Sequence, residues 1–336
     1  MTAAAVECEL CPRRCILANY QRGDCRVRVN VDGTLYTLVY GKPCAAHVDP
    51  VEKKPLFHFL PGTAIYSIAT AGCNLHCKFC QNWEISQTDP EDARNVDLEP
   101  ARVVAEAERA GCTSVAYTYS EPIIFYEYTL DASRLGRKRG LKNVLVTAGY
   151  IEPTPLRELC RVTDAANVDL KSMSDDFYRE ICGGRLAPVL KALTTFREEG
   201  VWLEVTNLLV PELNDAPSSV TALVRWVRDN LGAETPLHFS RFYPMYKLAN
   251  LAPTPVATLT MARNIALEEG LKYPYVGNVP GHPGNNTYCP GCGQAVVERH
   301  GYQILAYRLD GDKCNKCGAT VAGVWQKPPG DMRWAF

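Results

Sequence analysis

The sequence predicts an α/β fold: a partial (β/α)6 barrel with a small cysteine-rich β appendage before it and a zinc-ribbon-like or rubredoxin-like module after it. Three observations support this fold. Short apolar runs alternate with segments of helical spacing, most of the cysteines fall into three groups, and 46% of the 336 residues are hydrophobic, which is enough for a large core. We expect three parts, at residues 1–60, 61–280 and 281–336.

Six apolar runs have the length of buried parallel strands, and a seventh is weaker. They cover residues 64–70, 113–119, 143–147, 165–170, 201–206 and 237–240, with the seventh at 273–277. Segments with helical spacing lie between them, at 100–111, 186–200, 218–231 and 258–270. This alternation is typical of βα units around a parallel sheet, whose chemistry belongs at the C-terminal ends of the strands.

The N-terminal appendage contains a predicted hairpin. Two β-rich runs, 27–31 and 35–40, flank the turn dipeptide Asp32-Gly33.

Charge and composition favour a reduced, cytoplasmic location. The formal net charge is −1, so no overall field attracts nucleic acid or an anionic membrane. The N-terminus lacks the basic flank and apolar segment of a secretory signal, and no apolar run approaches the roughly 18 residues that span a bilayer. Arginines near the first cysteines could contact an acidic partner or RNA, or form a solvated face.

The most informative motif is Cys73-x3-Cys77-x2-Cys80, directly after the first barrel strand. It places three thiolates around one centre with no fourth cysteine in the loop. A cubane iron–sulfur cluster normally uses four cysteines, so three would leave one iron open to a substrate or cofactor. The alternative, a structural zinc loop, requires a fourth ligand, and the neighbours of His76 crowd that candidate.

A second motif lies near the C-terminus, where two C-x2-C pairs are separated by a hairpin-like stretch. It consists of Cys289, Cys292, Cys314 and Cys317. Four thiolates with this spacing predict a closed tetrahedral site for structural Zn2+, with redox iron or an auxiliary cluster as the alternative.

A third group lies at the N-terminus and consists of Cys8, Cys11, Cys15 and Cys25, with Cys44 as a possible substitute. It predicts a metal site whose occupant, Zn2+ or a second iron–sulfur cluster, is left open by the spacing. The remaining cysteines, Cys112, Cys160 and Cys182, lack partner spacing and are expected to be buried and inert.

The cluster motif resembles that of the radical S-adenosylmethionine (SAM) enzymes. Four segments, 72–83, 117–122, 168–171 and 275–278, resemble the branch related to pyruvate formate-lyase activating enzyme. More narrowly, the chain is similar to the radical SAM member of the AmmeMemoRadiSam system, including residues 47–62 ahead of the barrel, and this likeness covers essentially the whole length.

The resemblance implies an oxidoreductase or activase-like enzyme with a partial barrel, a [4Fe–4S] cluster and SAM. One electron would cleave SAM to methionine and a 5′-deoxyadenosyl radical, which removes a hydrogen atom from an unidentified substrate. Glycyl-radical activation of a partner protein is one such reaction. A flavodoxin or ferredoxin is the implied electron donor.

The resemblance also assigns residues around the cofactor. Cys73, Cys77 and Cys80 would bind the cluster, and Lys171 joins them in the catalytic set. Phe79 would pack near the adenine, and Ser120 and Glu121 stand where relatives have the Gly-Gly-Glu segment that receives the methionine amino group. Asp169 and Lys171 would hold the ribose, the carboxylate or the substrate, and Thr147 and Thr206 are further candidates. Val146 replaces an acid associated with a monovalent cation, so that cation is not expected.

Two other function classes fit parts of the sequence. A zinc-stapled RNA- or protein-binding module would use the barrel as a scaffold, and its binding would depend strongly on salt. An iron–sulfur redox sensor would hold the cluster without turning over SAM.

Overall fold

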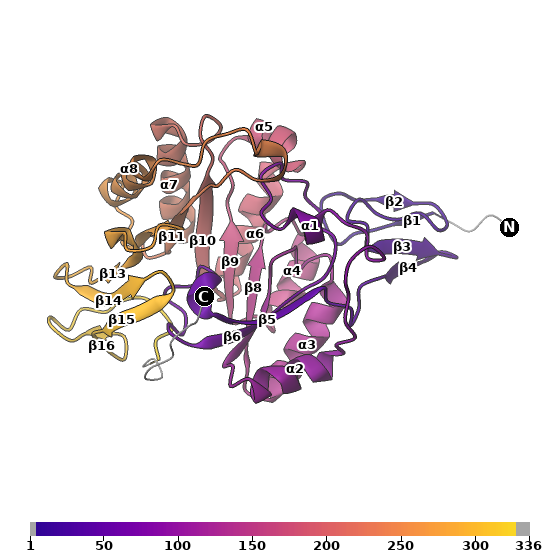
Figure 1. Ribbon diagram of the computed structural model, residues 1–336, viewed down its shortest axis with the longest axis horizontal. Coiled ribbons are helices and arrows are strands. Elements are labelled where there is room, and N and C mark those ends of the chain that lie inside the picture. The colour runs from indigo at the N-terminus through magenta and orange to yellow at the C-terminus, as the bar shows by residue number, and fades with distance from the viewer. Residues whose placement is uncertain (1–4, 327–336) are drawn as a thin grey trace.

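An eight-stranded sheet forms the centre of the computed structural model, which describes residues 5–326 (Figure 1). The strand order is β12-β11-β10-β9-β8-β7-β6-β5. Neighbours from β6 to β12 pair in parallel, and β5 pairs antiparallel with β6 at the edge. The strands are β5 (Ala45–Pro50), β6 (Ala64–Ala69), β7 (Ser114–Tyr117), β8 (Lys142–Thr147), β9 (Ala165–Asp169), β10 (Trp202–Leu209), β11 (Leu237–Arg241) and β12 (Pro274–Gly277).

Helices connect consecutive parallel strands, so residues 64–277 contain six βα units followed by β12. The helices are α1 (Trp83–Ser86), α2 (Pro100–Arg109), α3 (Tyr126–Lys138), α4 (Pro153–Cys160), α5 (Asp175–Phe177), α6 (Leu186–Glu198), α7 (Pro217–Leu231) and α8 (Val256–Glu268). A π-helix, η2 (Tyr178–Cys182), lies between α5 and α6. Proline begins α2, α4 and α7, where its missing N–H costs nothing.

The barrel is partial, as the sequence predicts. Among the described residues, β12 and β5 each pair with only one neighbour in the sheet. The structure adds two strands to the predicted six: the weaker run at 273–277 forms β12, and residues 45–50, which we expected within the appendage, form β5.

Residues 51–60 pack inside the barrel against the first halves of β9 and β10. The backbone N–H groups of Phe57 and His58 donate to the buried Glu204 carboxylate on β10, at 3.0 and 2.8 Å. Asn167 Nδ2 on β9 donates to Pro55 O at 2.8 Å. This segment closes one end of the barrel and leaves the C-terminal strand ends as the site of chemistry.

The N-terminal and C-terminal parts lie at opposite ends of the molecule (Figure 1). The first contains β1 (Val6–Glu7), β2 (Ile16–Leu17), β3 (Arg28–Val31) and β4 (Thr34–Thr37). The second contains β13 (Thr287–Tyr288), β14 (Ala295–His300), β15 (Gln303–Tyr307), β16 (Leu309–Asp310) and β17 (Lys313–Cys314). Asp32 and Gly33 between β3 and β4 have φ of 50° and 86°, as the predicted hairpin turn requires.

The C-terminal strands dock on the segment that fills the barrel. The fully buried Arg299 on β14 donates from Nη2 to Phe57 O at 2.8 Å and from Nη1 to Thr287 Oγ1 at 2.9 Å. Its guanidinium lies 4.3 Å from the Phe57 ring centroid. Of the 281–336 module, residues 327–336 lie outside the described residues.

No helix in residues 5–326 is long and apolar enough to cross a membrane.

Candidate active site and metal centres

The loop that follows β6 holds Cys73, Cys77 and Cys80, as the sequence predicts. Gly72 allows the chain to turn there, since its φ is +92° and an added Cβ would lie 2.5 Å from Cys25 O. Asn74 is fully buried, and its Nδ2 donates to Tyr150 O at 2.8 Å. The loop is therefore fixed by buried contacts.

The three thiols are close enough to affect one another's ionisation. Burial raises the pKa of the Cys73 thiol well above its usual range, and the nearby Glu121, Cys77 and Cys80 raise it further. Burial also raises the pKa of Cys80, whose Sγ lies 3.2 Å from Ser86 Oγ. Three thiols converging without a fourth in the loop fit the predicted cluster, whose chemistry requires one iron without a protein ligand.

Cys182 is buried, as we expected, and it lies within hydrogen-bond reach of Cys77. A hydrogen bond from Cys182 lowers the pKa of Cys77 to about 7, and the Lys171 ammonium also lowers it. Sequence spacing could not reveal this contact, because the two residues are 105 positions apart in the sequence and η2, which carries Cys182, brings them together.

The π-helix η2 holds the cluster loop from one side. The backbone N–H groups of His76 and Lys78 donate to Cys182 O at 2.8 Å and to Ile181 O at 2.9 Å. π-Helical turns occur frequently at functional sites. The His76 ring is half-buried and bonded at both nitrogens, to Gln87 Oε1 and Asp24 Oδ2, each at 2.8 Å. In this arrangement, neither nitrogen is left to ligate a metal.

Glu121 and Thr147 lie together at the ends of β7 and β8. The Glu121 carboxylate is buried and accepts hydrogen bonds from Thr147 Oγ1 at 2.5 Å, Ala148 N at 2.8 Å and Ile123 N at 3.2 Å. Burial raises its pKa to about 7, although these three donors lower it. The result is a preorganised acceptor near the cluster loop.

Tyr119 and Ser120 keep a glycine-like backbone without glycine. Tyr119 has φ of 62°, in the left-handed region that favours glycine. Its hydroxyl donates to Asp49, and Lys54 Nζ lies 4.3 Å from its ring centroid. Ser120 Oγ donates to Thr70 O at 2.7 Å, which ties the segment to the end of β6. Tyr119 therefore adopts a backbone conformation that glycine favours, although it is not glycine.

Asp169 and Lys171 form an ion pair at the end of β9, with Lys171 Nζ 2.9 Å from Asp169 Oδ2. Burial opposes the charge on Lys171, but Asp169, Cys77 and Cys182 raise its pKa well above the usual range. The same ammonium lies 5.6 Å from the Phe79 ring centroid. A cation is therefore held beside the cluster loop.

Thr206 lies one strand further, on β10. It is buried and donates from Oγ1 to Asn167 Oδ1 at 2.8 Å. Since this bond uses the hydroxyl proton, Thr206 links β10 to β9 inside the barrel.

The C-terminal cysteines converge tightly. The sulfurs of Cys289, Cys292, Cys314 and Cys317 all lie within 4.8 Å of one another. Tetrahedral Zn2+ with Zn–S bonds of about 2.3 Å requires sulfurs about 3.8 Å apart. Cys289 and Cys317 are 3.5 Å apart, and Cys292 and Cys314 are 3.8 Å apart. Backbone N–H groups of Cys317 and Lys316 lower the pKa of Cys314 to about 7, so the group could bind a metal ion.

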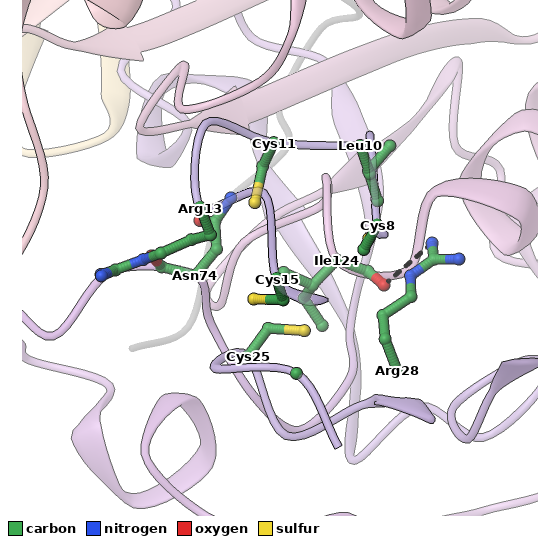
Figure 2. Close-up of a pocket in the computed structure, with 10 residues that line it drawn as sticks. Cys8, Leu10, Cys11, Arg13, Cys15, Cys25, Arg28, Asn74 and Ile124 are labelled. Carbon is green, nitrogen blue, oxygen red and sulfur yellow. Dashed lines mark hydrogen bonds between the residues drawn. The ribbon is translucent and has the colours of Figure 1, made fainter. Parts of the chain in front are cut away.

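The N-terminal cysteines line a separate cavity, which Figure 2 shows. They are Cys8, Cys11, Cys15 and Cys25. Cys44 does not line this cavity, and its Sγ lies 3.6 Å from Ala69 O at the β5–β6 pair. The nearby arginines are paired with acids: Arg13 with Asp24, Arg14 with Glu7, Glu9 and Glu152, Arg22 with Glu91, Arg26 with Asp89, and Arg28 with Glu127. All fifteen cysteines carry free thiols.

Comparisons with known proteins agree with this geometry. The family model of the Radical SAM superfamily matches residues 67–222, which include the end of β6, the cluster loop and β7 to β10. Pyruvate formate-lyase 1-activating enzyme of Escherichia coli K12 is 24% identical over 217 residues, covering 60% of this chain and 87% of that enzyme. A radical SAM methyltransferase structure from Sphaerobacter thermophilus aligns with a TM-score of 0.53 at 19% identity, over 70% of this chain and 71% of that one, and supports the fold alone.

A relative similar over nearly its whole length is the uncharacterized protein MJ0808 of Methanocaldococcus jannaschii. It is 48% identical over 318 residues, which are 94% of this chain and 95% of that protein. With three thiols at the end of the first barrel strand and these matches, the chain belongs to the radical SAM superfamily, in one family with MJ0808 and distantly related to the pyruvate formate-lyase activating enzymes.

Proposed function

We propose that this protein binds a [4Fe–4S] cluster through Cys73, Cys77 and Cys80 and reductively cleaves SAM there. The observation that carries the proposal is the convergence of these three thiols at the carboxyl end of β6, beside Lys171 and Glu121. When bound, the cluster supplies the electron that converts SAM to methionine and a 5′-deoxyadenosyl radical, which takes a hydrogen atom from the substrate.

The chain's own residues would position SAM. Glu121 accepts a hydrogen bond from the methionine amino group, a contact strengthened by the buried setting. Two neighbouring side chains would support this contact. Thr147 donates to Glu121 and orients its carboxylate, and Ser120 donates to Thr70 O and fixes the adjacent backbone.

Phe79, Asp169 and Lys171 would bind the other parts of SAM. Phe79 contributes its ring to the adenine side. Asp169 accepts from the ribose hydroxyls, and the Lys171 ammonium, close to both Phe79 and Cys77, pairs with the methionine carboxylate. Thr206 would act indirectly, through its hydrogen bond to Asn167 inside the barrel.

The relation to the activating enzymes supports a protein substrate, such as a glycine backbone position in a partner enzyme. A member of the AmmeMemoRadiSam system is the narrower proposal and rests on sequence resemblance. A flavodoxin or ferredoxin would supply the electron. The C-terminal thiols would hold a structural Zn2+ that staples a module with little core of its own.

Anaerobic reconstitution tests the central proposal. Cluster-loaded protein with dithionite and SAM should form 5′-deoxyadenosine and methionine in multiple turnovers or one. Cys77→Ala should form neither while keeping its zinc. A cluster-loaded wild-type protein that leaves SAM intact contradicts the proposal.

A further inference from the structure

We propose that Cys8, Cys11, Cys15 and Cys25 hold a second iron–sulfur cluster beside the catalytic loop. Two turns bring the four thiols together. The β1–β2 hairpin carries the first three, with Cys8 N donating to Cys15 O at 2.9 Å. Cys25 lies in a turn closed by Arg26 N donating to Gly23 O at 2.8 Å. All four line one cavity (Figure 2).

The spacing of these sulfurs favours a cluster over a single ion. Among the residues from 5 to 326, the C-terminal thiols form a group whose ligand atoms all lie within 4.8 Å, and the N-terminal thiols do not. The same chain therefore contains one site closed to the size of Zn2+ and one that is wider. Cys15 Sγ and Cys25 Sγ each lie 3.8 Å from where a Cβ on Gly23 would stand, so they remain near neighbours.

The space inside the cavity also favours a cluster over a single Zn2+ ion. The cavity has room for a water-sized body between the protein atoms that line it. Sulfurs around such a body stand roughly 3 Å or more from its centre. Zn2+ would need them at about 2.3 Å. A cubane, with one thiolate on each iron, fits the wider arrangement.

The walls suit an anionic cluster shielded from water. Leu10 and Ile124 provide apolar contact, and Cys8, Cys11 and Cys25 are buried. Arg28 is 5% exposed and binds Glu127 with its two terminal nitrogens, at 2.6 and 2.7 Å. Its buried Nε has no hydrogen-bond partner and belongs to a residue that lines the cavity. A cluster sulfur or thiolate would accept this hydrogen bond.

The two centres share a wall. Asn74, next to the proposed ligand Cys73, lines the N-terminal cavity, and Arg13 Nε donates to Asn74 O at 3.0 Å. On the other side, Gly72 packs on Cys25 O. A one-electron donor that reduces the second cluster could therefore pass that electron to the first, so that one centre is oxidised as the other is reduced. This exchange rests on the proposed function, but the presence of the second cluster does not.

The triple variant Cys73→Ala, Cys77→Ala, Cys80→Ala tests the site directly. After anaerobic reconstitution it should retain about four irons and four sulfides per chain, with about one zinc. A variant that holds no iron and about two zincs would overturn the proposal. Failure of the proposed function would appear separately, as wild-type protein that does not cleave SAM, and would leave this iron count unchanged.

A second variant keeps the test valid if the triple variant does not fold. This second triple variant, Cys8→Ala, Cys11→Ala, Cys25→Ala, leaves one thiol at the N-terminal site and should lower the iron of the reconstituted protein from about eight to about four per chain while the zinc stays constant. Iron that stays at the wild-type level would overturn the proposal.

Electron paramagnetic resonance tests the shared wall. The spectrum of dithionite-reduced wild-type protein should show magnetic coupling and differ from the sum of the spectra of the two triple variants, each of which retains one cluster. A spectrum equal to that sum would place the clusters apart and contradict the arrangement.

Discussion

Cys77 has two polar neighbours that a three-thiolate cluster does not require, Cys182 and Lys171. Both lower the pKa of its thiol, which helps to present the thiolate that binds iron. Cys182 is fully buried and comes from η2, the element that also holds the loop backbone. Its proximity raises a question that mutation can answer: whether it supports Cys77 or is a fourth ligand.

We expect Cys182→Ala to keep the cluster and SAM cleavage, because the loop supplies the three ligands by itself. The substitution removes one buried sulfur and should destabilise the fold by about 1 kcal/mol. Iron content and 5′-deoxyadenosine yield of the purified variant measure this, with Cys77→Ala as the matched loss of a ligand. Equal loss of iron in both variants would make Cys182 a cluster ligand.

Glu121 should make SAM affinity depend on pH. Its pKa is raised to about 7 by burial, so it is largely protonated at pH 6 and ionised at pH 8. Only the carboxylate accepts fully from the SAM amino group, so binding at pH 6 must release a proton and is weaker, by up to about tenfold per pH unit below the pKa. Titration of cluster-loaded protein in buffers of different ionisation heat measures both the affinity and the proton.

The variant Glu121→Gln separates this effect from the titration of SAM itself, which is common to both proteins. It should bind SAM at least about tenfold more weakly at pH 8 and show a smaller change between pH 6 and pH 8. Identical pH profiles for the two proteins would exclude Glu121 from the binding site.

At the scale of elements, Gly72 determines whether the cluster loop can form. Gly72→Ala adds a positive-φ penalty of about 1 to 2 kcal/mol and a clash with Cys25 O that costs about 1 to 3 kcal/mol more. Gly111 offers a matched control, because its φ of +67° carries the same penalty but an added Cβ meets nothing within 4 Å.

Denaturant titration of both glycine variants should therefore show the larger loss of stability in Gly72→Ala, and only that variant should reconstitute with less iron. Equal behaviour of the two variants would mean that the contact between the loop and Cys25 is not required for the site.

The elements that sequence patterns predicted are those whose burial follows a simple period. The seven apolar runs became β6 to β12, and the helix-spaced segments became α2, α6, α7 and α8 with ends shifted by a few residues. β5 was not predicted because its residues are mostly half-buried or exposed, and pairing with β6 alone makes them a strand.

The site was predicted where chemistry is local in sequence and missed where it is not. Three cysteines in one loop and two C-x2-C pairs carry their meaning in their spacing. The contact between Cys77 and Cys182 depends on η2, a π-helix that no periodicity marks. The width of the N-terminal site depends on how the β1–β2 hairpin packs against the loop at Gly72, which spacing does not specify.

At the scale of the whole molecule, one buried arginine joins the C-terminal module to the barrel. Arg299 contacts the 51–60 segment and lies 4.0 Å from Glu52. Burial raises the pKa of the Glu52 carboxyl to about 7, and the Arg299 guanidinium opposes this rise. Because a charged Glu52 is disfavoured in the folded state, its contribution to stability is greatest below pH 4.5 and declines as the pH rises through 7.

Removing Arg299 should release the module in a pH-dependent way. Arg299→Met leaves Glu52 without its cation and three acceptors without their donor, which should cost about 3 to 5 kcal/mol at pH 8. At pH 6 Glu52 is mostly protonated, so the deficit relative to wild type should be smaller. Limited proteolysis near residue 281 and denaturant titration at both pH values measure it. Arg308→Met, just after β15 and paired with the half-exposed Glu298 on β14, should cost no more than about 1 kcal/mol at either pH. An Arg299→Met deficit that grows as the pH falls would exclude Glu52 as the source of the pH dependence.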